Sequence, residues 1–469
     1  MLATKDMAPR ILPRPEHNLS RKDIDDDALK VLYRLKNAGF HAYLVGGGVR
    51  DLLLGRKPKD FDISTDAHPP QVKKQFRNCF IIGRRFRLCH VRFGRKVIEV
   101  STFRRQAEPE EGETLIRRDN TFGTPEEDAF RRDFTVNALF YDIATFSIID
   151  YVSGLEDIHA KVIRTIGDPV VRFREDPVRM LRAVSLASRL GFSIDSDSVQ
   201  AIRTMRGEIV KSSPARLLEE FYKVLRAGAA RETFGLLHAL GLLAYLLPEA
   251  DKAITEGGDR LLGSLARLDD FRNAGVAPPE SLTNPLLMGT LLVPLGVPLR
   301  RAVPSRRRGP ERDGEDELDG SAEEREPDDV SAEMEVLGTT EPVEETAPLA
   351  GPPVPLALPF ARRDLDRLRL ILAAQNRLRE VHSAPGVKRV LAGRGYFEES
   401  LRWMEIHGGA EGQELAAHWR SLDPGDVGPP AAEEAGEKRH RAHDGDGGQG
   451  PRRRRRRRRR RRPSPPSPA

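Results

Sequence analysis

The strongest constraint on the fold is a change in hydrophobic periodicity near residue 165. Before it, helical spacing over residues 23–40 alternates with β-rich segments such as 59–65 and 89–104. After it, apolar residues recur every three or four positions to about residue 299. Strands confined to the first part and helices alone in the second predict an α+β fold with a sheet-containing head and a helical region behind it.

Within the head, "HAYLVGG" at 41–47 is predicted to be a short strand. The following "VRDLLLG" at 49–55 is predicted to be a brief helix that Gly55 ends. The segment 59–65 reads as a strand, and 89–104 reads as a hairpin turning around residues 93–95.

Segregated charge predicts where the chain leaves the folded domains. Residues 311–347 hold 16 acidic and 2 basic residues, and 452–462 are eleven consecutive arginines. Blocks of like charge repel themselves and stay disordered. We expect a disordered lead (1–20), the head (21–165), a helical region (166–299), a disordered acidic insert (300–357), a C-terminal helical region (358–422) and a disordered Arg-rich tail (423–469).

Several protein classes are disfavoured. Cys79 and Cys89 are the only cysteines in 469 residues, which is no disulfide framework and fits a reducing cytoplasm. The first 23 residues lack the apolar core of a signal peptide. The longest apolar run, 235–247, is too short to span a bilayer. We therefore expect a cytoplasmic protein with no membrane association.

The motif "GGGVRD" at 46–51 joins the predicted strand to the predicted helix. Glycines let the backbone approach a ligand closely, and a helix N-terminus favours an anion, so Arg50 and these glycines could hold a phosphate. For a lone glycine triplet, an ordinary strand-to-helix turn is the better explanation, because such patterns recur by chance.

Asp60 and Asp62 flank Phe61 in "DFD". On a strand, side chains two apart share one face, so the two carboxylates would converge while Phe61 enters the core. Mg²⁺ between them would relieve their repulsion and still accept phosphate oxygens. A charged strand end is the simpler alternative, but the glycine motif so close by favours the metal site.

Other charged residues could complete such a site. Glu99 lies among apolar residues in "KVIEVSTF", where a carboxylate needs a partner, a metal or an exposed face. Arg132 and Asp133 precede an apolar stretch in "RRDFTVNALFYD" and could contact triphosphate and sugar or pair locally. The sequence leaves open whether Glu99 or Asp133 is the third acid.

A third motif, "EDPVRMLR", spaces Asp176, Arg179 and Arg182 three residues apart. On one helix they would share a slowly winding face. Salt bridges on a surface helix are one reading. The other is that Asp176 accepts from an exocyclic amine and Arg179 donates to a ring nitrogen, so that a base is recognised without a template.

In this order, residues 44–62, 131–142 and 174–192 resemble the class II nucleotidyltransferases, which comprise bacterial poly(A) polymerases and tRNA CCA-adding enzymes. The resemblance implies a polymerase-β-like nucleotidyltransferase head followed by an all-α neck and body. It implies Mg²⁺ on Asp60 and Asp62, and Asp133 as a further catalytic acid. The nucleotide-binding residues that it implies are Gly47, Gly48, Arg50, Arg132, Asp176, Arg179 and Arg182.

Residues 81–105 resemble the poly(A) polymerase branch. The predicted helices at 358–422 and the arginine-rich end resemble it too, which implies that 358–422 is an RNA-binding region. Residues 213–228 resemble the RNA-binding neck of both branches. Ser185 stands where the family commonly has another arginine, and the acidic insert is a second departure.

The expected function is template-independent addition of AMP from ATP to RNA 3′ ends, with release of pyrophosphate and no covalent enzyme intermediate. CCA, CC or A addition to tRNA is the alternative within the family, and a non-catalytic RNA-binding protein is the alternative outside it. The tail is expected to contact RNA phosphates, and residues 311–347 to compete with RNA for it. Expected partners are RNA and RNA-decay proteins, and the expected state is a monomer.

Overall fold

The computed structural model describes residues 8–83, 87–105, 121–275, 277–297, 358–382 and 384–422. The predictions of a disordered insert at 300–357 and of a disordered tail at 423–469 lie outside these residues. The chain divides into two compact units, and helix α16 (Pro385–Ala392) belongs to the second, smaller one. All the features described below belong to the first unit.

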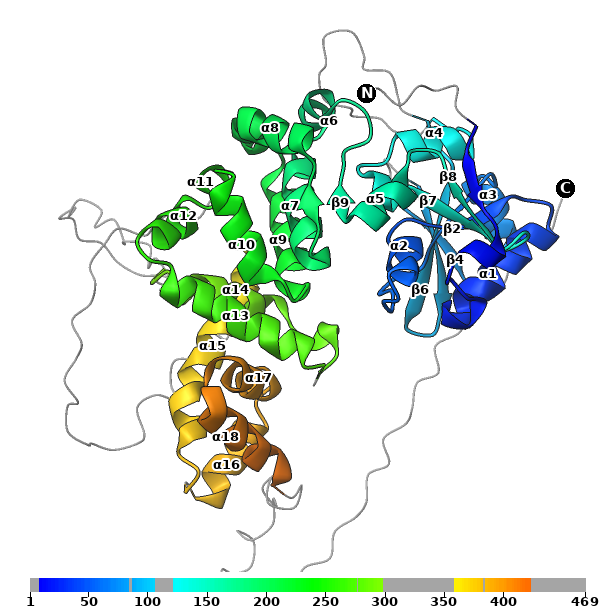
Figure 1. Ribbon diagram of the computed structural model, residues 1–469. Coiled ribbons are helices and arrows are strands. Elements are labelled where there is room, and N and C mark those ends of the chain that lie inside the picture. Colours follow the sequence, from blue (N-terminus) through cyan, green and yellow to red (C-terminus); the bar gives the residue numbers. More distant parts are fainter. Residues whose placement is uncertain are drawn as a thin grey trace, which may run out of the picture. The chain divides into compact units, whose positions relative to one another are not determined.

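A mixed sheet forms the framework of the head (Figure 1). Its strands within the described residues are β1 (Arg10–Leu12), β2 (Ala42–Val45), β3 (Asp62–Thr65), β4 (Cys79–Ile82), β5 (Leu88–Phe93), β6 (Lys96–Thr102), β7 (Leu139–Asp142) and β8 (Ser147–Asp150). They lie in the order β1-β8-β7-β2-β3-β6-β5-β4, and only β3 and β6 pair in parallel. The predicted strands and the hairpin at 93–95 are confirmed.

Helices α1 (Asp26–Asn37) and α3 (Pro69–Gln75) cover one face of this sheet. Their apolar residues pack with Leu44, Ile63 and Val100. The opposite face is covered over β2 and β7 by a smaller cluster that includes Phe140. The other head helices in the described residues are α2 (Gly47–Leu53), α4 (Pro125–Phe130), α5 (Gly154–Ala160) and the 3₁₀ turns η1 (Arg14–Glu16), η2 (Arg21–Asp23) and η3 (Thr135–Asn137).

The rest of the unit is helical, apart from a small parallel pair of strands, β9 (Val162–Ile163) and β10 (Ser193–Ile194). Its helices are α6 (Pro169–Glu175), α7 (Val178–Leu190), α8 (Ser196–Met205), α9 (Pro214–Arg226), α10 (Ala230–Ala239), α11 (Leu243–Leu246), α12 (Pro248–Thr255), α13 (Asp259–Asn273), α14 (Asn284–Leu292), α15 (Arg362–Arg379), α17 (Phe397–His407) and α18 (Gly409–Ser421). The α+β fold, with a sheet head and helical body, is confirmed. None of the helices described is both long and apolar enough to cross a membrane.

The predicted disordered lead over residues 1–20 is wrong for residues 8–20. Strand β1 pairs with β8 at the edge of the sheet, with Ile11 opposite Ile149. Leu19 is buried in the head core, and the His17 ring bonds to the carbonyl of Phe146. A three-residue strand has too little alternation to be recognised locally, because its stability comes from a distant partner.

Asp176 does not share a helix with Arg179 and Arg182. It caps the C-terminus of α6, and α7 begins after Pro177. Proline disfavours helical geometry in the residue before it, and Asp176 accordingly has φ −149° and ψ 91°. The three residues therefore lie on either side of a break between two helices.

Candidate active site

The glycine motif makes a sharp connection between β2 and α2. Gly46 has φ 72° and ψ −138°, a backbone conformation that residues other than glycine rarely adopt. The helix begins at Gly47, two residues before the predicted start. A Cβ on Gly48 would lie 3.3 Å from the carbonyl oxygen of Asp60, so glycine lets α2 approach the segment leading into β3.

Arg50 is buried beneath this turn rather than extended into solvent. Its Nε and Nη2 donate to Asp51 Oδ1 at 2.8 and 2.7 Å, and its Nη1 donates to Asn137 Oδ1. The Arg50 guanidinium therefore connects α2 to η3. A phosphate contact by Arg50 remains a prediction.

Asp60 and Asp62 lie at the start of β3. Asp62 pairs with Val45 of β2, and Phe61 packs against the head core as predicted. Burial, with additional repulsion from Glu99 and Asp60, raises the pKa of Asp62 to about 6. Asp60 is 71% exposed. Two interacting carboxylates, one of them hard to ionise alone, are a favourable setting for a divalent cation.

Glu99 lies beside Asp62 on the neighbouring strand. The pairing of Ile63 with Val100 places these two carboxylates next to each other on one face. Glu99 is half-exposed, and its Oε1 lies 3.5 Å from Nε2 of His90 on β5. The sequence offered Glu99 and Asp133 as candidates for the third acid. Of these two, Glu99 is the one whose charge raises the pKa of Asp62.

Asp128 fixes the arginines of the "RRD" motif. Its buried carboxylate contacts Arg131 Nε at 2.8 Å and Arg132 Nη2 at 2.9 Å. Burial acts to raise the pKa of Asp128, but Arg132 and Arg131 outweigh it and hold this pKa below its ordinary value. Arg132 also donates to Ser64 Oγ at 3.3 Å, which places its guanidinium over the β3 face that carries Asp62.

Asp133 is bound by partners other than the carboxylate pair. Its Oδ2 lies 2.6 Å from Arg182 Nη2, and its Oδ1 accepts from the backbone N–H of Phe134 and the side chain of Asn137. Burial opposes ionisation, but the charge of Arg182 holds the pKa of Asp133 below its ordinary value. Asp133 therefore links the head to α7.

The remaining predicted residues are held by partners that sequence reasoning missed. Arg216 of α9 binds both carboxylate oxygens of Asp176, at 2.8 and 2.6 Å. Arg179 donates to Glu175 Oε2 at 3.1 Å. Arg172 donates to the carbonyls of residues 131 and 132 at 2.6 and 2.7 Å. No local signal identifies the contacts of Arg216 and Arg172, because each joins segments about 40 residues apart, whereas Glu175 and Arg179 are only four residues apart.

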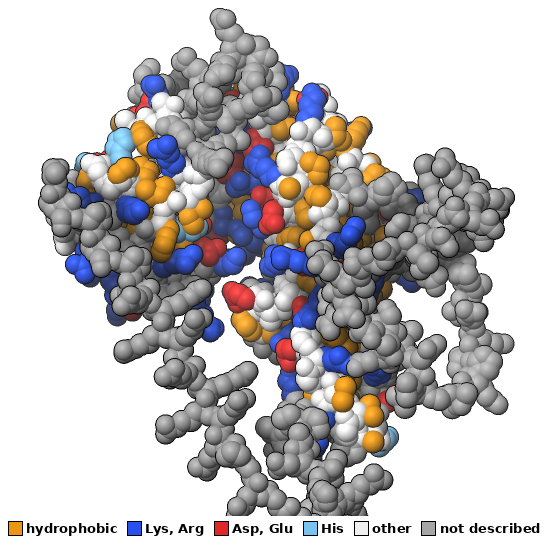
Figure 2. All heavy atoms as spheres, turned by 180° about the vertical axis from the view of Figure 1, so that it is seen from behind, with side chains coloured by type: hydrophobic (Ala, Val, Ile, Leu, Met, Phe, Trp, Pro, Cys, Tyr) orange, Lys and Arg blue, Asp and Glu red, His pale blue; other side chains and the backbone are white. Residues whose placement is uncertain are grey.

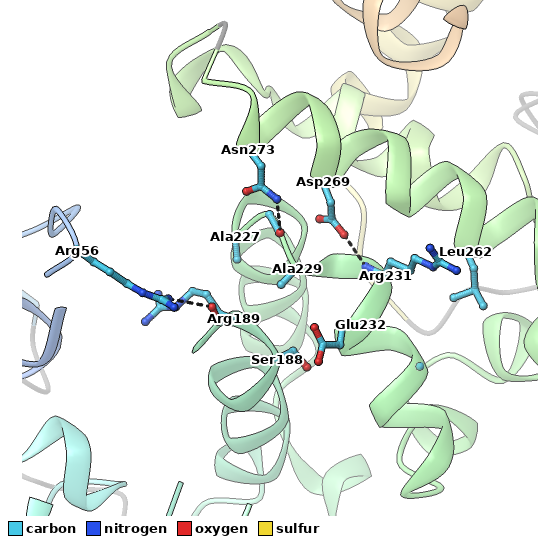
Figure 3. Close-up of a pocket in the computed structure, with 12 residues that line it drawn as sticks. Arg56, Ser188, Arg189, Ala227, Ala229, Arg231, Glu232, Leu262, Asp269 and Asn273 are labelled. Carbon is cyan, nitrogen blue, oxygen red and sulfur yellow. Dashed lines mark hydrogen bonds between the residues drawn. The ribbon is translucent and has the colours of Figure 1, made fainter. Parts of the chain in front are cut away.

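A cavity of about 770 Å³ lies elsewhere in the unit (Figure 3). It is lined by Arg56, Ser188, Arg189, Ala227, Gly228, Ala229, Arg231, Glu232, Gly235, Leu262, Asp269 and Asn273. Arg56 donates to the carbonyls of Arg189 and Leu190 at 3.2 and 3.3 Å. No predicted site residue lines this cavity.

Two carboxylates, Asp60 and Asp62, are the residues suited to hold a metal at the candidate site. No group of three or more His, Cys, Asp or Glu side chains able to hold a metal occurs in the residues that the structure describes. Mg²⁺ commonly takes one or two protein carboxylates and completes its octahedron with water and substrate phosphates. The raised pKa of Asp62 fits that donor set.

The chain is similar to known proteins over its head and part of the helical region. Residues 42–164 match the family model described as the poly A polymerase head domain. Residues 191–254 match one described as a probable RNA and SrmB-binding site of polymerase A. Poly(A) polymerase I of Salmonella typhimurium is 50% identical over 275 residues, covering 56% of this chain and 59% of the relative. The match thus spans little more than half of that relative's length.

The other branch of the superfamily is also similar. The CCA-adding enzyme of Lactobacillus helveticus is 41% identical over 215 residues, covering 45% of this chain and 53% of that protein. The crystal structure of a Bacillus stearothermophilus CCA-adding enzyme in complex with CTP has a TM-score of 0.55 at 26% identity, covering 87% and 88% of the two chains.

The head and the helices that follow it have the fold of the class II nucleotidyltransferases. Over residues 42–164 and 191–254, the chain is similar to the bacterial poly(A) polymerases within that class.

Proposed function

We propose that the protein adds AMP from ATP to RNA 3′ ends without a template and releases pyrophosphate. The observation that carries this proposal is the pair of carboxylates formed by Asp62 on β3 and Asp60 two residues before it, with Arg132 fixed by Asp128 over the face that carries Asp62. The 50% identity to a poly(A) polymerase I supports addition of adenylate residues rather than of CCA.

Asp60 and Asp62 would hold Mg²⁺, which stabilises negative charge on the attacking and leaving oxygens when bound. Arg132, held by Asp128 and Ser64, would orient the triphosphate and sugar. Residues 47, 48 and 50 would shape the phosphate side of the site. No covalent intermediate is part of the proposal, and the chain's contribution is positioning and charge.

Asp176, Arg179 and Arg182 would face the base and triphosphate. The partners of Asp176 and Arg179, namely Arg216 and Glu175, keep an acceptor and a donor in fixed places. Asp133 would act through Arg182, as a positioning residue, and Glu99 would be the third acid near Asp62.

RNA is the proposed second substrate. The match to an RNA-binding family model over 191–254 supports it, and Figure 2 shows Lys and Arg side chains gathered around acidic ones on one face. We propose residues 21–165 as the catalytic head, 166–299 as neck and body, and 358–422 as a further RNA-binding region. RNA-decay proteins as partners, a monomeric state and a cytoplasmic location complete the proposal.

The test is extension of RNA by the purified full chain. Unstructured RNA and tRNA are each incubated with Mg²⁺ and either ATP or CTP alone. Long A tails on unstructured RNA are expected. Addition of one to three nucleotides to tRNA only would identify the CCA-adding alternative, which the Lactobacillus helveticus relative favours. RNA binding without pyrophosphate release would identify a non-catalytic RNA-binding protein.

Asp60→Ala and Asp62→Asn test the site itself. Loss of several kcal/mol of charge stabilisation corresponds to a fall in kcat on the order of a thousandfold. Asp23→Asn, at an exposed carboxylate outside the site, is the matched control and should retain wild-type activity. Wild-type polymerisation by Asp60→Ala would show the assignment of this carboxylate to be wrong.

A further inference from the structure

A row of side chains runs from the candidate active site to the edge of the sheet. Glu99 of β6 neighbours Asp62 of β3 and pairs with His90 of β5, and His90 pairs with Phe80 of β4. Residues opposite each other in paired strands share a face. Asp62 and Phe80 therefore lie on one face, separated by three strand spacings, or about 14 Å.

This face ends in an exposed apolar patch made by Phe80 and Ile82, which are 50% and 42% exposed. The Arg92 guanidinium lies 4.8 Å from the centre of the Phe80 ring. Within the described residues, β4 is the outermost strand at this end of the sheet. Exposed apolar side chains on a sheet edge promote aggregation and are normally avoided, so their presence here calls for a function.

The other face of the same strands is built differently. Cys79, Cys89 and Val91 are all buried against the helix-covered core. The exposure of Phe80 and Ile82 is therefore not a sign of a loosely packed edge. The exposed apolar side chains of β4 lie on the face that carries Asp62, with one exception. Ile81, near the end of the strand, is 40% exposed on the opposite face.

An aromatic ring beside an arginine is suited to a nucleobase and its phosphate. Bases stack on aromatic side chains irrespective of sequence, and arginine adds attraction to the base and to the backbone charge. A template-independent enzyme needs such sequence-tolerant contacts with its primer. A second copy of this chain is a less suitable partner for the patch. In a symmetric dimer the two Arg92 guanidinium groups would meet at the contact and repel each other.

We propose that Phe80, Ile82 and Arg92 form a stacking platform for one base of the single-stranded primer RNA, a few nucleotides before the 3′ end. The proposal rests on the proposed function, because it takes the 3′ end to lie at Asp62. The primer would cross the open face over His90 and Glu99, and its upstream base would lie on the Phe80 ring.

The test is a scan with abasic primers on the full chain. One base is removed at each successive position from the 3′ end, and KM for RNA and kcat are measured with saturating ATP. The wild type should show a rise in KM of about tenfold when one particular upstream base is missing. Phe80→Ala should have the raised KM for RNA already with the intact primer, and removal of the same upstream base should not raise it further. Its kcat and its KM for ATP should be unchanged.

Matched controls come from the same sheet. Ile81→Ala removes an exposed apolar side chain from the opposite face of β4, and Ile11→Ala removes one from the opposite edge strand. Both should retain the wild-type profile. Phe80→Trp keeps an aromatic surface and should restore the position-specific effect.

Three results would overturn the platform. They are a flat abasic profile in the wild type, an identical profile in Phe80→Ala, or a dimer that Phe80→Ala dissociates without any change in KM for RNA. Failure of the proposed function would give a different result. No AMP would be transferred, but intact RNA would still quench the tryptophan fluorescence of Phe80→Trp, and the abasic primer would not. Loss of the platform with AMP transfer intact would leave the proposed function standing.

Discussion

Asp133 and Arg182 form an ion pair with 2.6 Å between Oδ2 and Nη2, and this contact joins the head to helix α7. Asp133 raises the pKa of Arg182, and Arg182 lowers that of Asp133. Two residues expected to contact the nucleotide therefore neutralise each other in the free protein. The pair fixes Arg182 before any ligand binds.

Asp133→Asn should destabilise the protein by about 1–3 kcal/mol. Removing one member of a buried ion pair leaves the other charge without a partner. The cost is limited here because Arg182 is 41% exposed and water can partly solvate it. The midpoint of urea unfolding measures the change. Glu414→Gln, at an exposed carboxylate of α18, should leave the midpoint unaltered. Equal midpoints for both variants would mean that the ion pair adds no stability.

Gly46→Ala should weaken nucleotide binding and cost about 1–3 kcal/mol of stability. An alanine would have to adopt φ 72° and ψ −138°, and its Cβ would lie 3.2 Å from Arg132 Nη1. A rise in KM for ATP and a lower unfolding midpoint are expected together. Gly235→Ala is the control, since that helical glycine has open space where a Cβ would lie. A Gly46→Ala variant with wild-type KM and stability would contradict the strained turn.

His407 should make the protein less stable in mild acid. Burial, with Arg267 nearby, lowers the pKa of His407 to about 3, and its Nε2 bonds to Thr290 Oγ1 at 3.0 Å. The unfolded chain takes up a proton as pH falls through about 6.5, but the folded protein does not. Stability is therefore complete above that pH and is lost as pH falls towards 3, with a slope of up to about 1.4 kcal/mol per pH unit.

Urea unfolding at pH 7.5 and pH 5.5 measures this loss. The wild type should lose about 1 kcal/mol more than His407→Gln between the two values. His159→Gln, at an exposed histidine of α5, should behave as the wild type does. Parallel losses in wild type and His407→Gln would show that another group is responsible.

Local pattern predicted the parts of the site that are continuous in sequence. The strand before the glycines, the hairpin at 93–95 and the inward Phe61 between two carboxylates all follow from alternation and turn residues. The helix start was predicted two residues late, since glycines are poor helix formers and the close approach of Gly48 to Asp60 is a tertiary contact.

Pairings between distant segments could not be predicted. Arg216 reaches Asp176 only because α9 packs near the end of α6, and Arg172 reaches the backbone of the "RRD" motif only because α6 meets the head. Asp128 has its arginines three and four residues away, so helical spacing could have indicated that contact. Its complete burial is what makes it important, and burial depends on the tertiary fold.

The pairing of β1 with β8 has a consequence for synthesis on the ribosome. Ile11 emerges well before its partner Ile149, and β8 must first pair with β7, which in turn pairs with β2. The nascent chain therefore keeps β1 unpaired until nearly the whole head has been made, because non-local strand pairing is slow and requires both strands. Until then β1 is an unpaired strand that other chains could contact. Once β8 has formed, β1 covers the sheet edge that β8 would otherwise expose.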